Sequence, residues 1–84
     1  MSYEIQITKQ AFKDIKSLTP KQKKKLQDIL LEVVAQNPLE GKKLIGDLEG
    51  NYSIRLNLKD RIVYSIDEDK KNIYIKRART HYGS

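Results

Sequence analysis

Residues 51–82 constrain the fold most strongly, because their pattern predicts three consecutive β-strands. Apolar and polar side chains alternate over residues 52–58, which is the period of a strand with one buried face. Residues 61–66 are nearly all apolar, as is typical of a central strand. A polar connection over residues 67–72 precedes a last strand, residues 73–80, that begins apolar and turns basic. The rest of the chain is therefore expected to cover one face of this sheet.

The first half of the chain predicts that cover. Residues 3–7 alternate as a short strand, and Thr8 can cap a helix over residues 9–17. In Thr19-Pro20-Lys21-Gln22, threonine suits the N-cap, proline the first helical position and glutamine the returning bond of a capping box. Asn37-Pro38 ends this second helix, because proline disfavours helix in the residue before it. The order β-α-α-β-β-β predicts an α+β domain in which a helical hairpin packs on a mostly antiparallel four-stranded sheet.

The apolar positions of these elements predict the core. On the first helix they are Ala11, Phe12, Ile15 and Leu18. On the second helix they are Leu26, Ile29, Leu30 and Val33, with Leu31 and Val34 beside them. On the strand that opens the last third they are Tyr52, Ile54, Leu56 and Leu58. The segment between, residues 39–50, contains three glycines and is predicted to be a surface loop, long enough to be functional or mobile.

Length and composition restrict the class of protein. Eighty-four residues suffice for one domain, 1–84, with a single core. A formal net charge of +6 favours a polyanionic partner such as RNA, DNA or an acidic protein segment, although it also fits a soluble protein that is merely basic. The absence of cysteine and the single histidine argue against a metal site, so neither a metal nor another cofactor is expected. No apolar run has the length of a membrane span or a signal peptide, so the expected location is the cytoplasm.

Cationic side chains in the last third suggest chemistry on a phosphate. They are Arg55, Arg61, Arg77, Arg79 and the only histidine, His81, which Tyr82 follows. A guanidinium presents a planar fork to phosphate oxygens, and an imidazole with a pKa of about 6.5 can hold or release a proton near neutral pH. A solitary histidine near the C-terminus is in most small proteins a solvated side chain, and Arg77 and Arg79 also fit charged guards of an edge strand. The lysines at the start of the second helix fit either a solvated face or a nucleic-acid backbone.

Three segments carry a family resemblance. They are Asn37-Pro38-Leu39-Glu40-Gly41-Lys42, Tyr52-Ser53-Ile54-Arg55 together with Arg61-Ile62-Val63-Tyr64, and Arg79-Thr80-His81-Tyr82. At this spacing they resemble the RelE/ParE superfamily of bacterial toxins, and within it the Txe/YoeB branch of messenger-RNA interferases. The resemblance implies a RelE-like, small-RNase-like fold and cleavage of translated mRNA in the A site of the ribosome. It also implies an antitoxin whose tail wraps the basic surface.

The resemblance carries over to single residues. His81 matches the family's terminal catalytic histidine, and Arg61 matches the arginine of its Arg-(Leu/Ile)-Val-Tyr strand. The family's loop glutamate is replaced here by Gly46, and the nearest carboxylates are Asp47 and Glu49. The hypothesis is that His81 is the general acid, Arg61 stabilises the transition state, and Glu49 or Asp47 is the general base. The RNA-binding candidates are Arg55, Arg79, Tyr82, Lys42, Lys43 and Arg77.

The hypothesis is a metal-independent endoribonuclease in which the RNA 2′-hydroxyl is the internal nucleophile. The expected partners are a cognate antitoxin and the 70S ribosome with its mRNA, with a homodimer as a further option and no membrane. A ParE-like inhibitor of DNA gyrase without nuclease activity is the alternative, since fold alone does not separate the two. A third option is a basic module on free RNA or DNA, which the scarcity of stacking aromatics disfavours.

Overall fold

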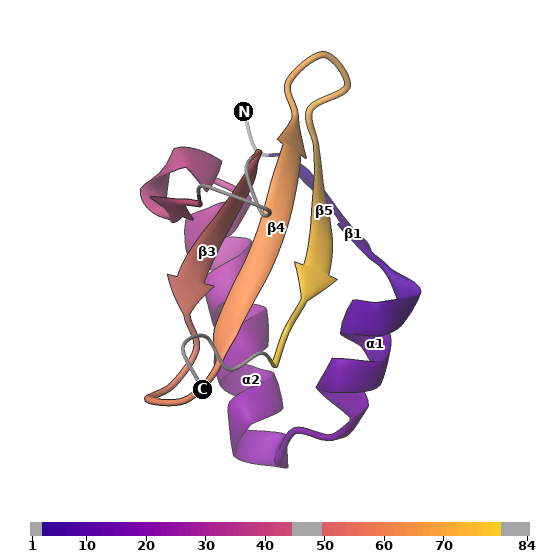
Figure 1. Cartoon of the computed structure of the whole chain (residues 1–84), viewed down its shortest axis with the longest axis vertical. Helices are drawn as coiled ribbons and strands as arrows, with labels where there is room; N and C mark the ends of the chain where they lie inside the picture. The colour runs from indigo at the N-terminus through magenta and orange to yellow at the C-terminus, as the bar shows by residue number, and fades with distance from the viewer. Residues whose placement is uncertain (1–2, 45–49, 80–84) are drawn as a thin grey trace.

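The computed structural model describes residues 3–44 and 50–79 of the chain. In chain order these residues form β1 (Glu4–Ile7), α1 (Lys9–Lys16), α2 (Pro20–Ile29), the π-helical turn η1 (Leu30–Val34), the 3-10 turn η2 (Pro38–Glu40), β2 (Lys42–Lys43), β3 (Asn51–Arg55), β4 (Arg61–Asp67) and β5 (Asn72–Arg77). Figure 1 shows the helices on one side of the sheet, with α2 passing behind β3 and β4. The predicted α+β class is confirmed.

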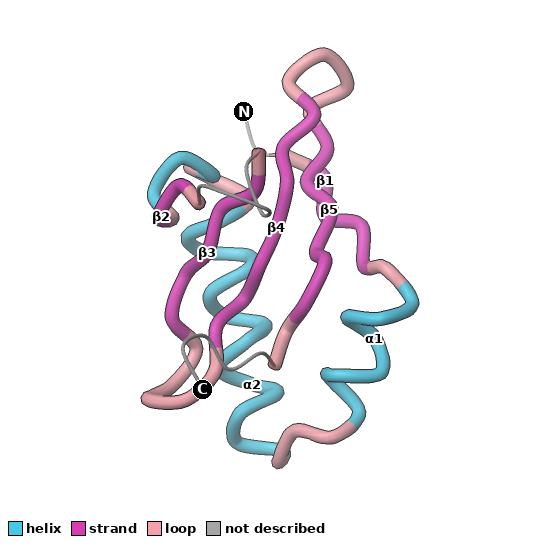
Figure 2. Tube along the Cα trace, in the orientation of Figure 1, coloured by secondary structure: helices cyan, strands magenta, loops and turns pink. Residues whose placement is uncertain are grey.

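The sheet has the strand order β1-β5-β4-β3-β2. β1 pairs with β5 in parallel, and the other neighbours are antiparallel. The predicted number of four strands is therefore wrong, because β2 adds a fifth strand within the segment expected to be a loop (Figure 2). β2 consists of two exposed lysines, so it has no alternating apolar pattern from which it could be predicted.

Local capping explains why the predicted helix starts are confirmed. Thr8 Oγ1 accepts a hydrogen bond from the Ala11 amide at 3.3 Å. The capping box is complete, since Gln22 N donates to Thr19 Oγ1 at 3.2 Å and Thr19 N donates to Gln22 Oε1 at 3.4 Å. After α2 the helix widens into η1, where the Ala35 amide donates to the Leu30 carbonyl at 2.8 Å.

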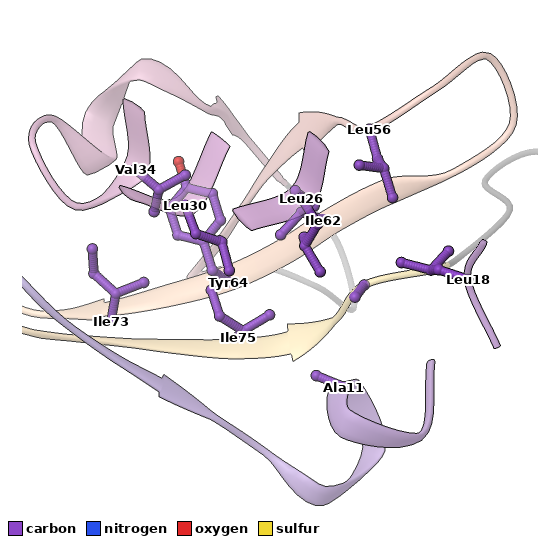
Figure 3. Close-up of a cluster of buried hydrophobic side chains, with 11 residues drawn as sticks. Ala11, Leu18, Leu26, Leu30, Val34, Leu56, Ile62, Tyr64, Ile73 and Ile75 are labelled. Carbon is purple, nitrogen blue, oxygen red and sulfur yellow. The ribbon is translucent and has the colours of Figure 1, made fainter. Parts of the chain in front are cut away.

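The core lies between the helices and one face of the sheet, as Figure 3 shows. Its fully buried hydrophobic side chains include Tyr64, Leu56, Ile62, Ile73, Ile75 and Val34. Three predicted core positions are wrong, since Phe12, Leu31 and Leu58 are 53%, 55% and 92% exposed. Leu58 lies in the turn after β3, because Asn57 Oδ1 accepts from the amides of Lys59 and Asp60 at 2.8 Å each and so ends the strand earlier. The buried stripe of the second helix is narrower than predicted, because Leu31 lies outside it. On α1, Phe12 lies outside the core, with the Lys16 ammonium over its ring.

Tyr64 fastens β2 and η2 to the sheet. Its hydroxyl donates to the Pro38 carbonyl at 2.5 Å, and burial raises its pKa to about 12. A Cβ at Gly41 would collide with the Tyr64 hydroxyl and the Ser53 carbonyl, so only glycine fits there. Two of the segments that carry the family resemblance are therefore packing partners in this fold.

Candidate phosphate-binding site

The face of β3 and β4 away from the helices carries the candidate site. Tyr52, Ile54 and Ile62 point to the core, so alternation sends their neighbours to the opposite face. We define the arginine face as these neighbours together with the β2 lysine opposite Ser53: Lys42, Ser53, Arg55, Arg61 and Val63. In Figure 1 this face is turned toward the viewer, because α2 lies behind the two strands.

Arg55 and Arg61 lie directly opposite each other across the β3–β4 pair. Like charges at opposed positions destabilise a sheet, so this pair costs the fold stability. Within the part of the chain that the structure describes, neither guanidinium has an ion pair or a hydrogen bond. Arg55 is exposed and Arg61 is half-buried. The pair therefore presents two positive charges without a counterion among the described residues, an arrangement suited to a bound anion.

The turn between the two arginines holds them in register. The amides of Leu56 and Asn57 donate to the Asp60 carbonyl at 3.0 and 3.3 Å, and Asn57 Nδ2 donates to Asp60 Oδ2 at 3.2 Å. Neither Asn57 nor the buried Asp60 was among the residues predicted from the sequence. Their signal was present in the chain, since Asn and Asp at this separation are typical of a side-chain-closed turn.

Arg77 and Arg79, both predicted to bind RNA, contact their own chain. Arg77 Nε donates to Asp14 Oδ2 at 2.7 Å. Arg79 Nη1 donates to the Ser17 carbonyl and hydroxyl at 3.0 and 3.1 Å, and its Nε lies 3.8 Å from Asp60 Oδ2. These contacts fasten the segment after β5 to α1 and to the β3–β4 turn.

The two lysines of β2 point in opposite directions. Lys42 is in register with Ser53, so it shares the arginine face, whereas Lys43 is in register with Tyr52 and points to the other side. Both side chains are exposed. Only Lys42 is therefore placed to contact the same ligand as Arg55 and Arg61.

A family model described as the YoeB-like toxin of bacterial type II toxin-antitoxin systems matches residues 7–82. This chain belongs to that family. A comparison with curated proteins gives no match.

Solved structures of toxins share the fold. The toxin–antitoxin complex RelBE2 from Mycobacterium tuberculosis matches with a TM-score of 0.86 and 27% identity, over 96% of this chain and 99% of that chain. The YoeB–YefM complex from Staphylococcus aureus matches with a TM-score of 0.78 and 32% identity, over 98% of this chain and 100% of that chain. A YoeB dimer from Staphylococcus aureus matches with a TM-score of 0.79 and 31% identity, over 98% and 100% of the two chains.

The remaining candidates of this YoeB-like toxin, His81, Tyr82, Asp47 and Glu49, lie outside the described residues. The topology nevertheless fixes where their segments join the sheet. The C-terminal end of β3, the N-terminal end of β4 and the C-terminal end of β5 lie at the same end of the sheet. The chain therefore leaves β5 at the end of the sheet that carries Arg55 and Arg61. The loop that contains Asp47 and Glu49 joins the sheet at Asn51, about 13 Å along β3 from Arg55.

The described residues contain no group of three or more His, Cys, Asp or Glu side chains that could hold a metal ion. Among the same residues, no helix combines the length and apolar character that crossing a bilayer requires.

Proposed function

We propose that this toxin is a ribosome-dependent endoribonuclease that cleaves mRNA in the A site without a metal. The observation that carries the proposal is the opposed pair Arg55 and Arg61, which the hairpin holds without a counterion among the described residues at a cost in stability. A fold that only had to be stable would place a carboxylate or a neutral side chain at one of these positions. The pair suits an RNA phosphodiester, whose oxygens accept hydrogen bonds from both guanidiniums.

The chemistry requires three groups around that phosphate. A base removes the proton from the 2′-hydroxyl, the oxygen attacks the adjacent phosphorus, and an acid protonates the departing 5′-oxygen. In the proposal Arg61 meets the charge on the phosphorane, His81 supplies the proton, and Glu49 or Asp47 is the base. In the proposal the phosphate binds at the end of the arginine face that carries Arg55 and Arg61, which is also the end where β5 finishes, because Ser53 and Val63 farther along this face are buried.

The other candidates surround this position. Arg55 and Lys42 orient the phosphate, and Tyr82 stacks on a base or helps to place His81. Lys43 lies on the opposite side of β2, so we assign it to ribosomal RNA. Arg77 and Arg79 contribute positive charge from the end of β5, where their guanidiniums also donate hydrogen bonds to the Asp14 carboxylate and the Ser17 carbonyl.

We further propose that a cognate antitoxin inhibits the toxin by covering the arginine face. Two of the similar structures are complexes of a toxin with an antitoxin. The uncompensated charges of Arg55 and Arg61 favour an acidic antitoxin segment. In the proposal the same charges contact mRNA on the 70S ribosome, and the toxin acts in the cytoplasm. Association of two copies is a further proposal, supported by the similar dimer from Staphylococcus aureus.

The test uses purified toxin, 70S ribosomes and a defined mRNA. Wild-type toxin is expected to cut the message at codon positions in the A site and to leave 5′-hydroxyl ends, whereas His81→Ala is expected not to cut. Lys70→Ala is the matched control, because Lys70 is an exposed cation in the hairpin at the other end of the sheet. Intact mRNA together with inhibited supercoiling by DNA gyrase would contradict the proposal and support the ParE-like alternative.

A further inference from the structure

Asp14 of α1 is a buried carboxylate that binds the chain where it leaves β5. Its Oδ2 accepts hydrogen bonds from Arg77 Nε at 2.7 Å, from the Ala78 amide at 3.1 Å and from the Arg79 amide at 3.4 Å. Its Oδ1 accepts from Arg77 Nη2 at 3.3 Å. One side chain therefore holds three consecutive residues that lie more than sixty positions away in the sequence.

These hydrogen bonds take the place of strand-to-strand hydrogen bonds at the point where β5 ends. β5 ends at Arg77, so the amides of Ala78 and Arg79 have no neighbouring strand in the described structure to accept from them. A register shift just before this point pairs Tyr64 with Ile75 and Val63 with Arg77, and such a bulge bends the strand. A buried amide without an acceptor is costly, so Asp14 stabilises one direction of the chain after the bend.

Asp14 is charged when it does so. Burial raises the pKa of this carboxyl, but the hydrogen bonds from Arg77, Ala78 and Arg79 and the charge of Arg77 outweigh burial and lower it overall. Hydrogen bonds to an ionised acceptor are shorter and stronger than neutral ones. The carboxylate therefore holds the two backbone amides firmly at neutral pH.

The side chain of Arg79 makes a second set of contacts with the protein. Arg79 reaches the Ser17 carbonyl and hydroxyl at the end of α1 and lies beside the buried Asp60. Asp60 directly precedes Arg61 in the chain. The segment after β5 is thus fixed between α1 and the turn that carries Arg61.

We propose that Asp14 is a positioning residue for catalysis, because it sets the direction in which the chain leaves β5 toward His81. The inference rests on the proposed function. His81 follows Arg79 by two residues, so only Thr80 lies between His81 and the segment that Asp14 binds. A change of direction at Ala78 and Arg79 therefore displaces His81 directly. A misplacement of about 1 Å can cost a hundredfold in rate.

The test compares Asp14→Asn with Asp28→Asn. Asp28 is the matched control, because it is a carboxylate of the same helical hairpin that pairs, among the described residues, with the exposed Lys24 at 2.7 Å. Asp14→Asn is expected to lower kcat for ribosome-dependent cleavage by at least about tenfold, with KM within about twofold of wild type. The ring NMR signals of His81 are expected to shift in Asp14→Asn alone. They are easily identified because the chain has one histidine.

Arg77→Gln separates the carboxylate from the ion pair. This variant removes the guanidinium but leaves Asp14 bound to the Ala78 and Arg79 amides, so it should shift the His81 signals and lower kcat less than Asp14→Asn does. An equal loss in both variants would assign the effect to the ion pair and overturn the proposal. If Asp14→Asn does not fold, a loss of about tenfold in kcat in a folded Arg77→Gln protein would overturn the proposal, because the amide bonds to Asp14 would then not suffice to position the tail.

The two proposals can fail separately. If wild-type toxin does not cleave mRNA, the proposed function fails, and the His81 signals still report whether Asp14 sets the direction of the tail. If folded Asp14→Asn keeps the wild-type kcat and His81 signals and loses only thermal stability, Asp14 is a structural residue and the positioning role is wrong.

Discussion

Two pairs of arginines lie at the same end of the sheet in opposite surroundings. Arg55 and Arg61 face each other on the side of the sheet away from the helices, without a counterion among the described residues, whereas Arg77 and Arg79 contact Asp14, Ser17 and Asp60. Both pairs are partly accessible to water, so exposure does not distinguish them. Their partners do: a compensated guanidinium stabilises the fold, and an uncompensated one destabilises it and is available to a ligand. Function and stability should therefore separate between the two pairs.

The largest expected effect is on catalysis by Arg61→Ala. Removal of one group that stabilises transition-state charge typically lowers the rate by about 10²–10³-fold. The same change should leave the unfolding free energy unchanged or slightly raised, because it relieves the repulsion with Arg55. Single-turnover cleavage on the ribosome and urea denaturation measure the two quantities. A variant that is inactive because it is unfolded would break the comparison.

The converse effect is expected for Arg77→Ala. Removal of the guanidinium leaves the buried Asp14 carboxylate without its charged partner, which costs about 3–5 kcal/mol for a fully buried pair. Because the Arg77 side chain is 41% exposed, the expected loss of unfolding free energy is smaller, about 2 kcal/mol. Lys24→Ala, which breaks an exposed pair with Asp28, should cost far less, because solvent screens a surface ion pair. Similar losses in both variants would show that the Asp14–Arg77 pair is not special.

The Asp14–Arg77 contact should also give stability a specific dependence on pH. The pKa of Asp14 in the folded chain lies below its ordinary value of 3.8. The stabilisation is therefore complete above that value and is lost as the pH falls through the lower folded pKa. Urea denaturation between pH 6 and pH 2 should show a loss in the wild type that is smaller in Asp14→Asn. Parallel curves for the two proteins would contradict this assignment.

The smallest effect should distinguish the two lysines of β2. Lys42 shares the arginine face and Lys43 does not, although the two residues are adjacent and both exposed. Lys42→Ala should raise KM for ribosome-dependent cleavage by about twofold to fivefold, which corresponds to a surface charge interaction of about 0.4–1 kcal/mol. Lys43→Ala should raise KM less. Equal effects would mean that both lysines contact RNA without regard to the face of the strand.

Local patterns predicted most of the fold. The helix starts at Thr8 and Thr19 are correct because an N-cap is satisfied by residues within three positions. The strand pattern of residues 61–66 is correct because both faces of β4 are largely buried. The predictions that Phe12 and Leu58 are buried are wrong, because helical and strand periods identify an apolar stripe but not where the elements that bury it end. β2 could not be predicted, since its pairing with β3 depends on Tyr64 and Gly41 bringing the two segments together.

The candidate site divides in the same way. Its residue types were predicted from the sequence, and the opposed arrangement of Arg55 and Arg61 follows from a hairpin that is local in the chain. The buried Asp14 was missed, because nothing near it in sequence marks a carboxylate that binds a segment more than sixty residues later. His81, Tyr82, Asp47 and Glu49 remain predictions of role.

The sequence by itself determined the order of the two helices and the four longer strands, the helix starts and the family, because these depend on short-range hydrogen bonds and on motifs at fixed spacing. Only the tertiary structure decided which arginines are compensated. Arg77 and Asp14 meet because α1 packs beside the end of β5, and Arg79 and Asp60 meet because β4 and β5 are antiparallel. Charge compensation depends on distances of a few ångströms between residues far apart in the chain, and those distances are set by how the helices and strands pack.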